Sequence, residues 1–140
     1  MNIALGDLRA AYRRISGRIY RILDDGYDFS AEDRLIDVLD RDALIVDAAF
    51  FVLIFGQIEN RINELAGRKL TTERQRLALR DTKFGRRMGM TLPGPDNKAV
   101  RDEIESWYGL RSEAAYGERL TTYNIANVFD RADQLESLLQ

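Results

Sequence analysis

The segment Ala43–Ala66, which reads ALIVDAAFFVLIFGQIENRINELA, decides the fold. Its first half is apolar on every side, whereas in its second half apolar residues recur at Ile58, Ile62 and Leu65, at steps of four and three. Ile, Val and Phe also suit buried strands, but a helical period that continues to Leu65 favours a helix. A helix that is apolar on all sides must be buried on most of them. The segment is therefore predicted to be the central helix of the fold, or a helix shared with a partner chain.

Helical patterns continue on both sides of this segment. Apolar residues from Leu5 to Ile22 recur every three or four positions and stop at the turn signal Asp24–Gly26. Ser30–Asp33 and Thr72–Gln75 have the form of capping boxes, so a helix is expected to begin at each of them. The pattern as a whole is typical of an all-α protein.

The boundaries of these helices depend on a few residues. A kink is expected near Asp40, the stretch 110–120 has no clear pattern, and Thr121 or Thr122 is expected to cap the last helix. The predicted fold is an antiparallel bundle of about five helices in a single domain, residues 1–140. The predicted helices span residues 3–24, 31–66, 72–89, 98–109 and 121–139.

The composition excludes several kinds of chemistry. The chain has 140 residues, with no cysteine and no histidine, so it has no disulfide, no Cys-based zinc site and no thiol nucleophile. It also lacks the side chain that titrates near neutral pH and is the commonest metal ligand. The chain contains no glycine-rich phosphate loop, no nucleophile elbow and no HExxH motif. We therefore expect no metal and no cofactor.

Neither a signal peptide nor a transmembrane segment is expected. The N-terminus lacks the basic and apolar regions of a secretory signal. The longest apolar run, Ala48–Phe55, is too short to span a bilayer, which takes about 20 residues. The expected location is the cytoplasm, with no membrane partner.

Charge is unevenly distributed along the chain. The net charge is −2, yet Arg68–Arg101 carries ten Lys and Arg against three Asp and Glu, a net of +7, and Leu23–Gly67 is acidic. In a helix over residues 72–89, four cations would share one face and could follow the phosphates of RNA. A solvated face, or contact with the acidic segment of another copy, is the alternative. The candidate nucleic-acid-binding residues are Arg76, Arg80, Lys83, Arg86 and Arg87, and all but Arg86 lie on that face.

One motif lies between the last two predicted helices. Arg111-Ser112-Glu113-Ala114-Ala115-Tyr116-Gly117 follows an amphipathic helix and precedes the C-terminal one. The string and the helix order resemble the HEPN superfamily of small helical bundles, whose signature is an Arg, four to six residues and a His; a common variant reads Arg-x-x-Ala-Asp-Tyr-Gly. The resemblance implies a homodimer with two motifs at the interface. It also implies metal-independent ribonuclease chemistry, in which the His moves protons and the Arg steadies the phosphate.

The chain departs from that signature at the decisive position. Arg111 matches the family's Arg, but Tyr116 stands where the His would be, and a tyrosine with a pKa of about 10 moves protons poorly at pH 7. In one unbroken helix the two residues would lie about 140° apart, so they converge only across a helix break or two chains. Arg111 could instead pair with a nearby glutamate, and Tyr116 could be a packed aromatic. The nearby glutamates are Glu103, Glu105 and Glu113.

Three functions remain open. The first is a HEPN-like protein without the usual catalysis that binds RNA, a nucleotide or a partner protein. The resemblance places such proteins in toxin–antitoxin or phage-defence systems, some of them with a nucleotidyltransferase as partner. The second is an active ribonuclease that uses Arg111 and Tyr116, or Glu113. The third is a structural helical homodimer joined through the apolar helix.

Overall fold

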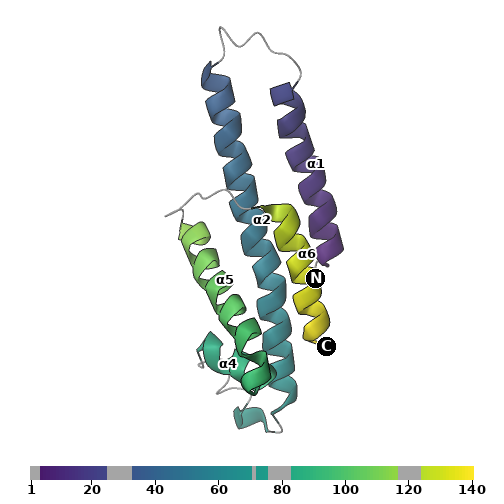
Figure 1. Cartoon of the computed structure of the whole chain (residues 1–140), viewed down its shortest axis with the longest axis vertical. Helices are drawn as coiled ribbons and strands as arrows, with labels where there is room; N and C mark the ends of the chain where they lie inside the picture. The colour runs from purple at the N-terminus through teal and green to yellow at the C-terminus, as the bar shows by residue number, and fades with distance from the viewer. Residues whose placement is uncertain (1–3, 25–32, 71, 76–82, 117–123) are drawn as a thin grey trace.

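The computed structural model describes residues 4–24, 33–70, 72–75, 83–116 and 124–140 (Figure 1). Over these residues the chain is helical and contains no strand, which confirms the all-α prediction. Successive long helices run in opposite directions, as expected for an antiparallel bundle. The elements are α1 (Leu5–Asp24), α2 (Asp33–Arg68), α4 (Phe84–Thr91), the 3-10 turn η2 (Pro95–Asn97), α5 (Lys98–Tyr116) and α6 (Ile125–Leu138).

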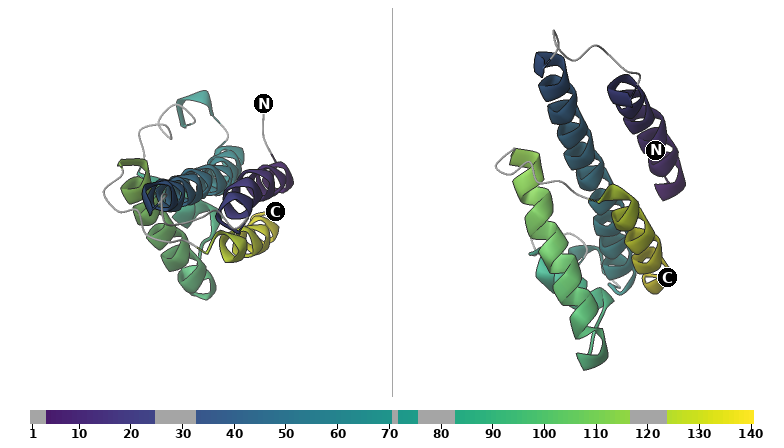
Figure 2. Two further views of the ribbon diagram at one scale, coloured as in Figure 1. Left: turned by 90° about the horizontal axis from the view of Figure 1, so that it is seen from above. Right: turned by 45° about the horizontal axis from the view of Figure 1, so that its top comes forward.

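Helix α2 is the central helix, as its apolar sequence predicts. Each of α1, α4, α5 and α6 packs against it, and the view from above shows them arranged around it (Figure 2). Full burial of one large apolar side chain stabilises the fold by about 1.5–3 kcal/mol, so this set provides most of the driving force. The largest fully buried side chains are Phe51, Ile54, Phe55, Ile58 and Ile62 of α2, Ile104 of α5, Ile125, Phe129 and Leu135 of α6, and Leu139.

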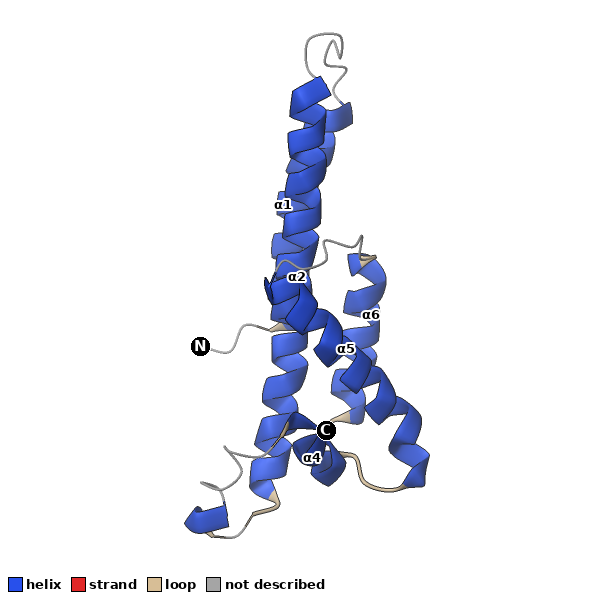
Figure 3. Ribbon diagram, turned by 90° about the vertical axis from the view of Figure 1, so that its left-hand side faces the viewer, coloured by secondary structure: helices blue, strands red, loops and turns tan. Residues whose placement is uncertain are grey.

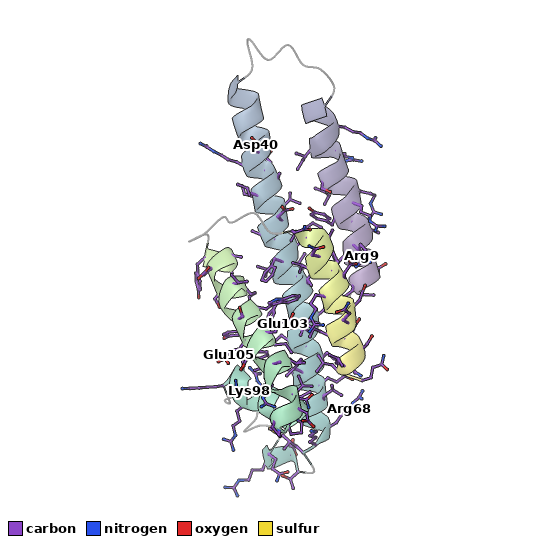
Figure 4. The ribbon with its side chains drawn as sticks, in the orientation of Figure 1. Arg9, Asp40, Arg68, Lys98, Glu103 and Glu105 are labelled. Atoms are coloured by element: carbon purple, nitrogen blue, oxygen red, sulfur yellow. The ribbon has the colours of Figure 1, made fainter. Side chains whose placement is uncertain are left out.

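Ion pairs connect the outer helices around this core. Arg9 of α1 lies beside α6 (Figure 4) and pairs with Asp130 at 2.9 Å and Asp133 at 3.1 Å. Glu103 of α5 pairs with Arg131 of α6 at 2.6 Å. These contacts fix how α6 lies against its neighbours on either side.

The kink predicted near Asp40 is wrong. Helix α2 continues through Asp40, Arg41 and Asp42 without a break, and all three side chains are exposed. Sharp kinks need a proline, a glycine pair or an inserted group, and none of these is present at this point. Three charged residues in a row therefore only mark a solvent-exposed turn of the helix.

The two N-terminal helices form a long hairpin. Seen from the side, its upper part extends well beyond α5 and α6 (Figure 3). Where the hairpin enters the core, the Tyr12 hydroxyl donates a hydrogen bond of 2.7 Å to the carboxylate of Asp47. Asp47 is the one buried polar residue in the described part of the chain, and its burial raises its pKa, although the bond from Tyr12 acts in the opposite direction. The charged residue within the apolar segment is thus accommodated by a partner on α1.

The predicted helix over residues 72–89 is not continuous. The capping box at its start is confirmed: the Gln75 N–H donates to the Thr72 hydroxyl at 3.2 Å, and the Thr72 N–H donates to the Gln75 side chain at 3.3 Å. Lys83, however, is extended, with φ −60° and ψ 146°, and α4 begins only after it. Phe84 and Met88 then bury the single apolar face of this short helix. Burial of these two anchors, more than helical propensity, sets where the segment becomes helical.

The boundaries of the last two helices also differ from the prediction. Helix α5 does not end near residue 109 but continues to Tyr116. Leu110 packs against the core, and Arg111 binds α2, so tertiary contacts carry the helix past Gly109. Helix α6 begins after Asn124, whose side chain accepts a hydrogen bond of 3.3 Å from the Asn127 N–H. The threonines predicted as its cap, Thr121 and Thr122, lie outside the described residues.

Candidate functional site

The three residues of the Arg–Tyr motif lie on one continuous helix. Arg111, Glu113 and Tyr116 all belong to the last two turns of α5, which is unbroken as far as it is described. Residues five positions apart on such a helix point about 140° apart around its axis. Within one chain, the structure therefore does not bring Arg111 and Tyr116 together.

Arg111 is engaged in the interior of the bundle. Its guanidinium donates to a carboxylate oxygen of Glu59 on α2 at 2.8 Å. The same group lies 5.1 Å from the ring centre of Tyr108 and 5.7 Å from that of Phe55. Both side chains of the ion pair are mostly buried, and Arg111 Nε is buried without a hydrogen-bond partner. Arg111 therefore links α5 to α2 and presents little of its charge to a ligand.

The predicted partners of Arg111 are wrong, because the pairing is tertiary. Glu103, Glu105 and Glu113 are its neighbours along the helix, but Glu103 instead binds Arg131 of α6. Glu59 is 52 positions away in the sequence and meets Arg111 only because α5 packs on α2. Glu59 lies off the apolar positions Ile58, Ile62 and Leu65, on a side of α2 that α5 in part covers.

An aromatic cluster supports this ion pair. The rings of Phe84 and Tyr108 stack with their centres 5.0 Å apart and their planes inclined by 9°. Phe55 meets both rings edge-on, at 5.8 Å and 6.0 Å. Helices α2, α4 and α5 therefore meet in one cluster directly beneath the Arg111 guanidinium, and the residues serve packing.

Tyr116 lies on a different side of α5. It is 81% exposed, so the interpretation of Tyr116 as a packed aromatic within the chain is wrong. Its ring lines a groove of about 770 Å³ between α2 and the end of α5. The lining is mostly apolar, and four of its eight residues are alanines: Ile45, Ala48, Ala49, Val52 and Leu53 of α2, and Ala114, Ala115 and Tyr116 of α5.

Two features of the sequence bear on this groove. The first half of the segment Ala43–Ala66 is apolar on every side, which predicts burial on most sides, yet Ile45 and Leu53 remain 53% and 45% exposed. The pair Ala114-Ala115 beside a tyrosine is the second signal, because small residues leave room against a neighbouring helix. Only the packing of α5 against the middle of α2 places the two features side by side.

The predicted stripe of candidate nucleic-acid-binding residues lies only in part within the described residues. Arg76 and Arg80 lie outside the described residues. Lys83 and Arg86 are exposed, whereas the Arg87 guanidinium lies 5.9 Å from the Phe84 ring and its Nε is buried. Since Lys83 is extended, the steps of four, three and four no longer fall on one helix. The described members therefore provide two exposed cations and one that is used in packing.

The described residues contain neither a metal-binding cluster nor a membrane-spanning helix. Among the described residues, no group of three or more carboxylates is placed to hold a metal ion. None of the described helices has the length and hydropathy needed to cross a lipid bilayer.

Comparison with known proteins found no match for this chain among protein-family models, curated proteins or solved structures.

Proposed function

We propose that the protein acts by binding rather than by catalysis, as a helical homodimer joined through the groove between α2 and α5. The observation that carries the proposal is the exposed apolar lining of that groove, with Tyr116 at its edge. Large contiguous apolar patches, of more than about a few hundred Å², are uncommon on monomeric proteins and typically mark a protein interface. Ile45, Leu53 and Tyr116 are three of the large apolar side chains that the described chain exposes, and all three line this groove.

A second copy of this chain is the occupant that the groove fits. A two-fold interface uses the same patch on both copies, so the patch must contain both a protrusion and a matching hollow. Tyr116 is the protrusion, and Ala48, Ala49 and Ala114 leave the hollow. A two-fold axis through the groove would place each tyrosine over the partner's alanines. The net charge of −2 opposes such self-association only weakly.

The shape of the molecule supports the same occupant. The upper part of the α1–α2 hairpin extends beyond α5 and α6 (Figure 3), so there α2 has α1 as its neighbouring helix. Two antiparallel helices bury much less apolar surface than four. Side-by-side pairing of two copies along α2 would also bring the extended parts of the two hairpins together as four helices, beyond the groove.

Catalysis is the weaker interpretation. A ribonuclease that uses Arg111 and Tyr116 would need an arginine free to meet phosphate, but Arg111 is bound to Glu59 and lies over two rings. It would also need a proton-transfer group near pH 7, and the chain has no histidine. Loss of such a group lowers the rate by about 10²–10⁴-fold. The proposed homodimer therefore holds the HEPN-like motif as a structural element.

The resemblance to HEPN proteins is part of this proposal. Its support is that Arg111–Tyr116 lies at the end of α5, and that α6, the next described helix, is the last; that family carries its motif before or at the start of its last helix. The associated context of toxin–antitoxin or phage-defence systems, a nucleotidyltransferase partner and a cytoplasmic location stay predictions.

The oligomeric state of matched variants tests the homodimer. In Leu53→Asp a charge replaces a groove residue, whereas Leu138→Asp changes a side chain of similar exposure, 54%, on α6 away from the groove. We expect the wild type and Leu138→Asp to have the mass of a dimer by light scattering, and Leu53→Asp to be a folded monomer. Wild-type protein that remains monomeric at high micromolar concentration, or a loss of the dimer in both variants, would contradict the proposal.

Cross-linking locates the interface independently. Because the chain contains no cysteine, each single-cysteine variant has one reactive thiol and no background. Ala49→Cys lies in the groove, and Ala99→Cys lies on an exposed position near the start of α5. A short bismaleimide should join two copies of the first variant and leave the second uncrosslinked; equal yields would place the interface elsewhere.

A further inference from the structure

A second surface, on α1, has no role in the proposed dimer. Four exposed arginines and one glycine line a hollow of about 310 Å³ on this helix: Arg13, Arg14, Gly17, Arg18 and Arg21. Along the sequence these arginines fall between the apolar positions of the helix. Their grouping around a hollow depends on the helical geometry, which places positions four apart on the same side.

These arginines have no counter-charges in the described part of the chain. None of the four forms an ion pair with a described residue, although Arg9 on the same helix pairs with two aspartates of α6. Four neighbouring guanidinium groups that have no described acidic partner concentrate a positive potential on one face of α1. Such a face attracts anions most strongly when the ionic strength is low.

Gly17 is a second observation, independent of the charges. It lies in the middle of α1, where glycine is unfavourable compared with alanine. A Cβ at this position would meet nothing within 4 Å, so no neighbouring described segment requires a glycine. What the glycine does provide is the floor of the hollow between the arginines.

We infer that this hollow binds the phosphate backbone of a nucleic-acid duplex. The planar guanidinium binds phosphate oxygens through two parallel hydrogen bonds, and all four cations here are arginines. Every lining residue comes from α1, so the hollow has no second wall with which to enclose a small molecule. From Arg13 to Arg21 the helix rises about 12 Å, which matches about three phosphates of one strand at 3.4 Å each.

The absence of stacking groups favours a duplex over a single strand. Proteins that bind single strands place aromatic side chains where bases can stack. The residues that line this hollow include no aromatic side chain. Contact is therefore with phosphates alone and is independent of base sequence, and RNA and DNA duplexes offer the same chemistry.

A matched pair of variants at Gly17 provides the first test. The probes are short fluorescein-labelled RNA and DNA duplexes of one sequence, and the measurement is fluorescence anisotropy. Gly17→Glu places a carboxylate near Arg13, Arg14 and Arg21, at helical spacings of four, three and four, and should weaken binding of the preferred duplex at least tenfold. Gly17→Ala keeps the charges and should stay within about twofold of wild type. Both variants fit the helix, so neither result reflects misfolding.

A pair of triple variants provides the second test. Arg14→Gln, Arg18→Gln and Arg21→Gln together remove three charges from the hollow. The control removes three exposed charges elsewhere, at positions that are not candidate nucleic-acid-binding residues: Arg68→Gln, Arg74→Gln and Lys98→Gln. The first triple should reduce the magnitude of the slope of log K against log salt by up to about 2.7, at about 0.9 per lost phosphate contact. The control should leave the slope near its wild-type value.

Several outcomes would overturn the inference. They are no duplex binding by the wild type, equal losses in the two triples, no effect of Gly17→Glu, or preferential binding to phosphatidylserine vesicles. If the arginines instead bound the acidic segment of a second copy, the Gly17→Glu variant would differ from the wild type in oligomer mass in the absence of duplex. That result would also contradict the inference. None of these outcomes affects the groove, so the homodimer can fail or hold independently.

Discussion

The guanidinium of Arg111 uses one edge to bind Glu59 and one face to cover Tyr108 and Phe55. An ion pair at a protein surface contributes little, because water screens it and the side chains lose freedom. This pair is mostly covered, and the rings on which it rests hold the arginine in place. We therefore expect it to stabilise the packing of α5 on α2 more than an exposed pair on the same helix would.

A double-mutant cycle at Arg111 and Glu59 measures this contribution. We expect Arg111→Ala to lower the free energy of unfolding by about 1–2 kcal/mol, and the double variant to cost clearly less than the sum of the two single variants. The matched control is the exposed pair Lys98–Asp102, also on α5, with an expected coupling of at most about 0.5 kcal/mol. Urea denaturation gives both couplings. Equal values would mean that Arg111 has no special structural role.

Asp47 is a second residue whose surroundings determine its chemistry. Burial disfavours its charged form and raises its pKa above the ordinary value of 3.8, while the hydrogen bond from Tyr12 lowers the pKa in part. The native state therefore holds the Asp47 proton at pH values where the unfolded chain has lost it. The free energy of unfolding therefore falls as the pH rises from 3.8, the ordinary pKa of this carboxyl group, to its native pKa. Above the native pKa the contribution of Asp47 is constant.

The pH dependence of stability tests this reasoning. Relative to Asp47→Asn, the wild type should lose stability as the pH rises from about 4 through the native pKa of Asp47. Tyr12→Phe removes the bond that lowers the pKa, so its loss should extend to higher pH, and it should cost about 1 kcal/mol near neutrality. Urea denaturation over this pH range gives the curves. A wild-type curve parallel to that of Asp47→Asn would show that Asp47 titrates alike in both states.

At the scale of elements, α2 has two faces with different consequences. Phe51 is 1% exposed and its ring lies 5.8 Å from that of Trp107, whereas Leu53, two positions along the same helix, faces the groove. Composition cannot separate the two residues, because both belong to a run that is apolar on every side. The helices that pack on α2 decide which positions are core and which are surface.

Aspartate at these two positions should therefore have opposite effects on folding. Phe51→Asp buries a charge that has no partner in the core, so we expect it to unfold the chain at 25 °C. Leu53→Asp should keep the helical circular-dichroism spectrum and a cooperative thermal transition. Folded Phe51→Asp with an unchanged transition would show that α2 is not central in the way described.

The shorter helices show how tertiary contacts override local signals. A capping box at Thr72–Gln75 forms as the sequence predicts, because all of its atoms lie within four residues. The helix expected to run from it does not continue through Lys83, since Phe84 and Met88 fix a separate helix against α2. On α5 tertiary contacts lengthen a helix instead. The contacts of Leu110 and Arg111 with the core and α2 extend it beyond Gly109.

At the scale of the whole molecule, the two proposed surfaces are separate. The groove lies between α2 and α5, and the arginine hollow lies on α1, where every residue that lines it is contributed by that helix. A homodimer formed through the groove would carry two such hollows and could contact a duplex at two points. Two linked contacts raise the overall affinity if both can engage at once. Because the chain has no cysteine, either surface can be labelled at a single introduced cysteine.

The all-α class, the central place of α2 and the lack of histidine chemistry follow from the sequence, because periodicity, hydropathy and residue counts are local properties. The partner of Arg111, the exposure of Tyr116 and the interruption at Lys83 depend on contacts between segments far apart along the chain. The groove and the arginine hollow likewise depend on which helix faces are left uncovered. A sequence states which residues must be buried somewhere; only the packed helices determine which neighbour covers each face and which faces stay open to a partner.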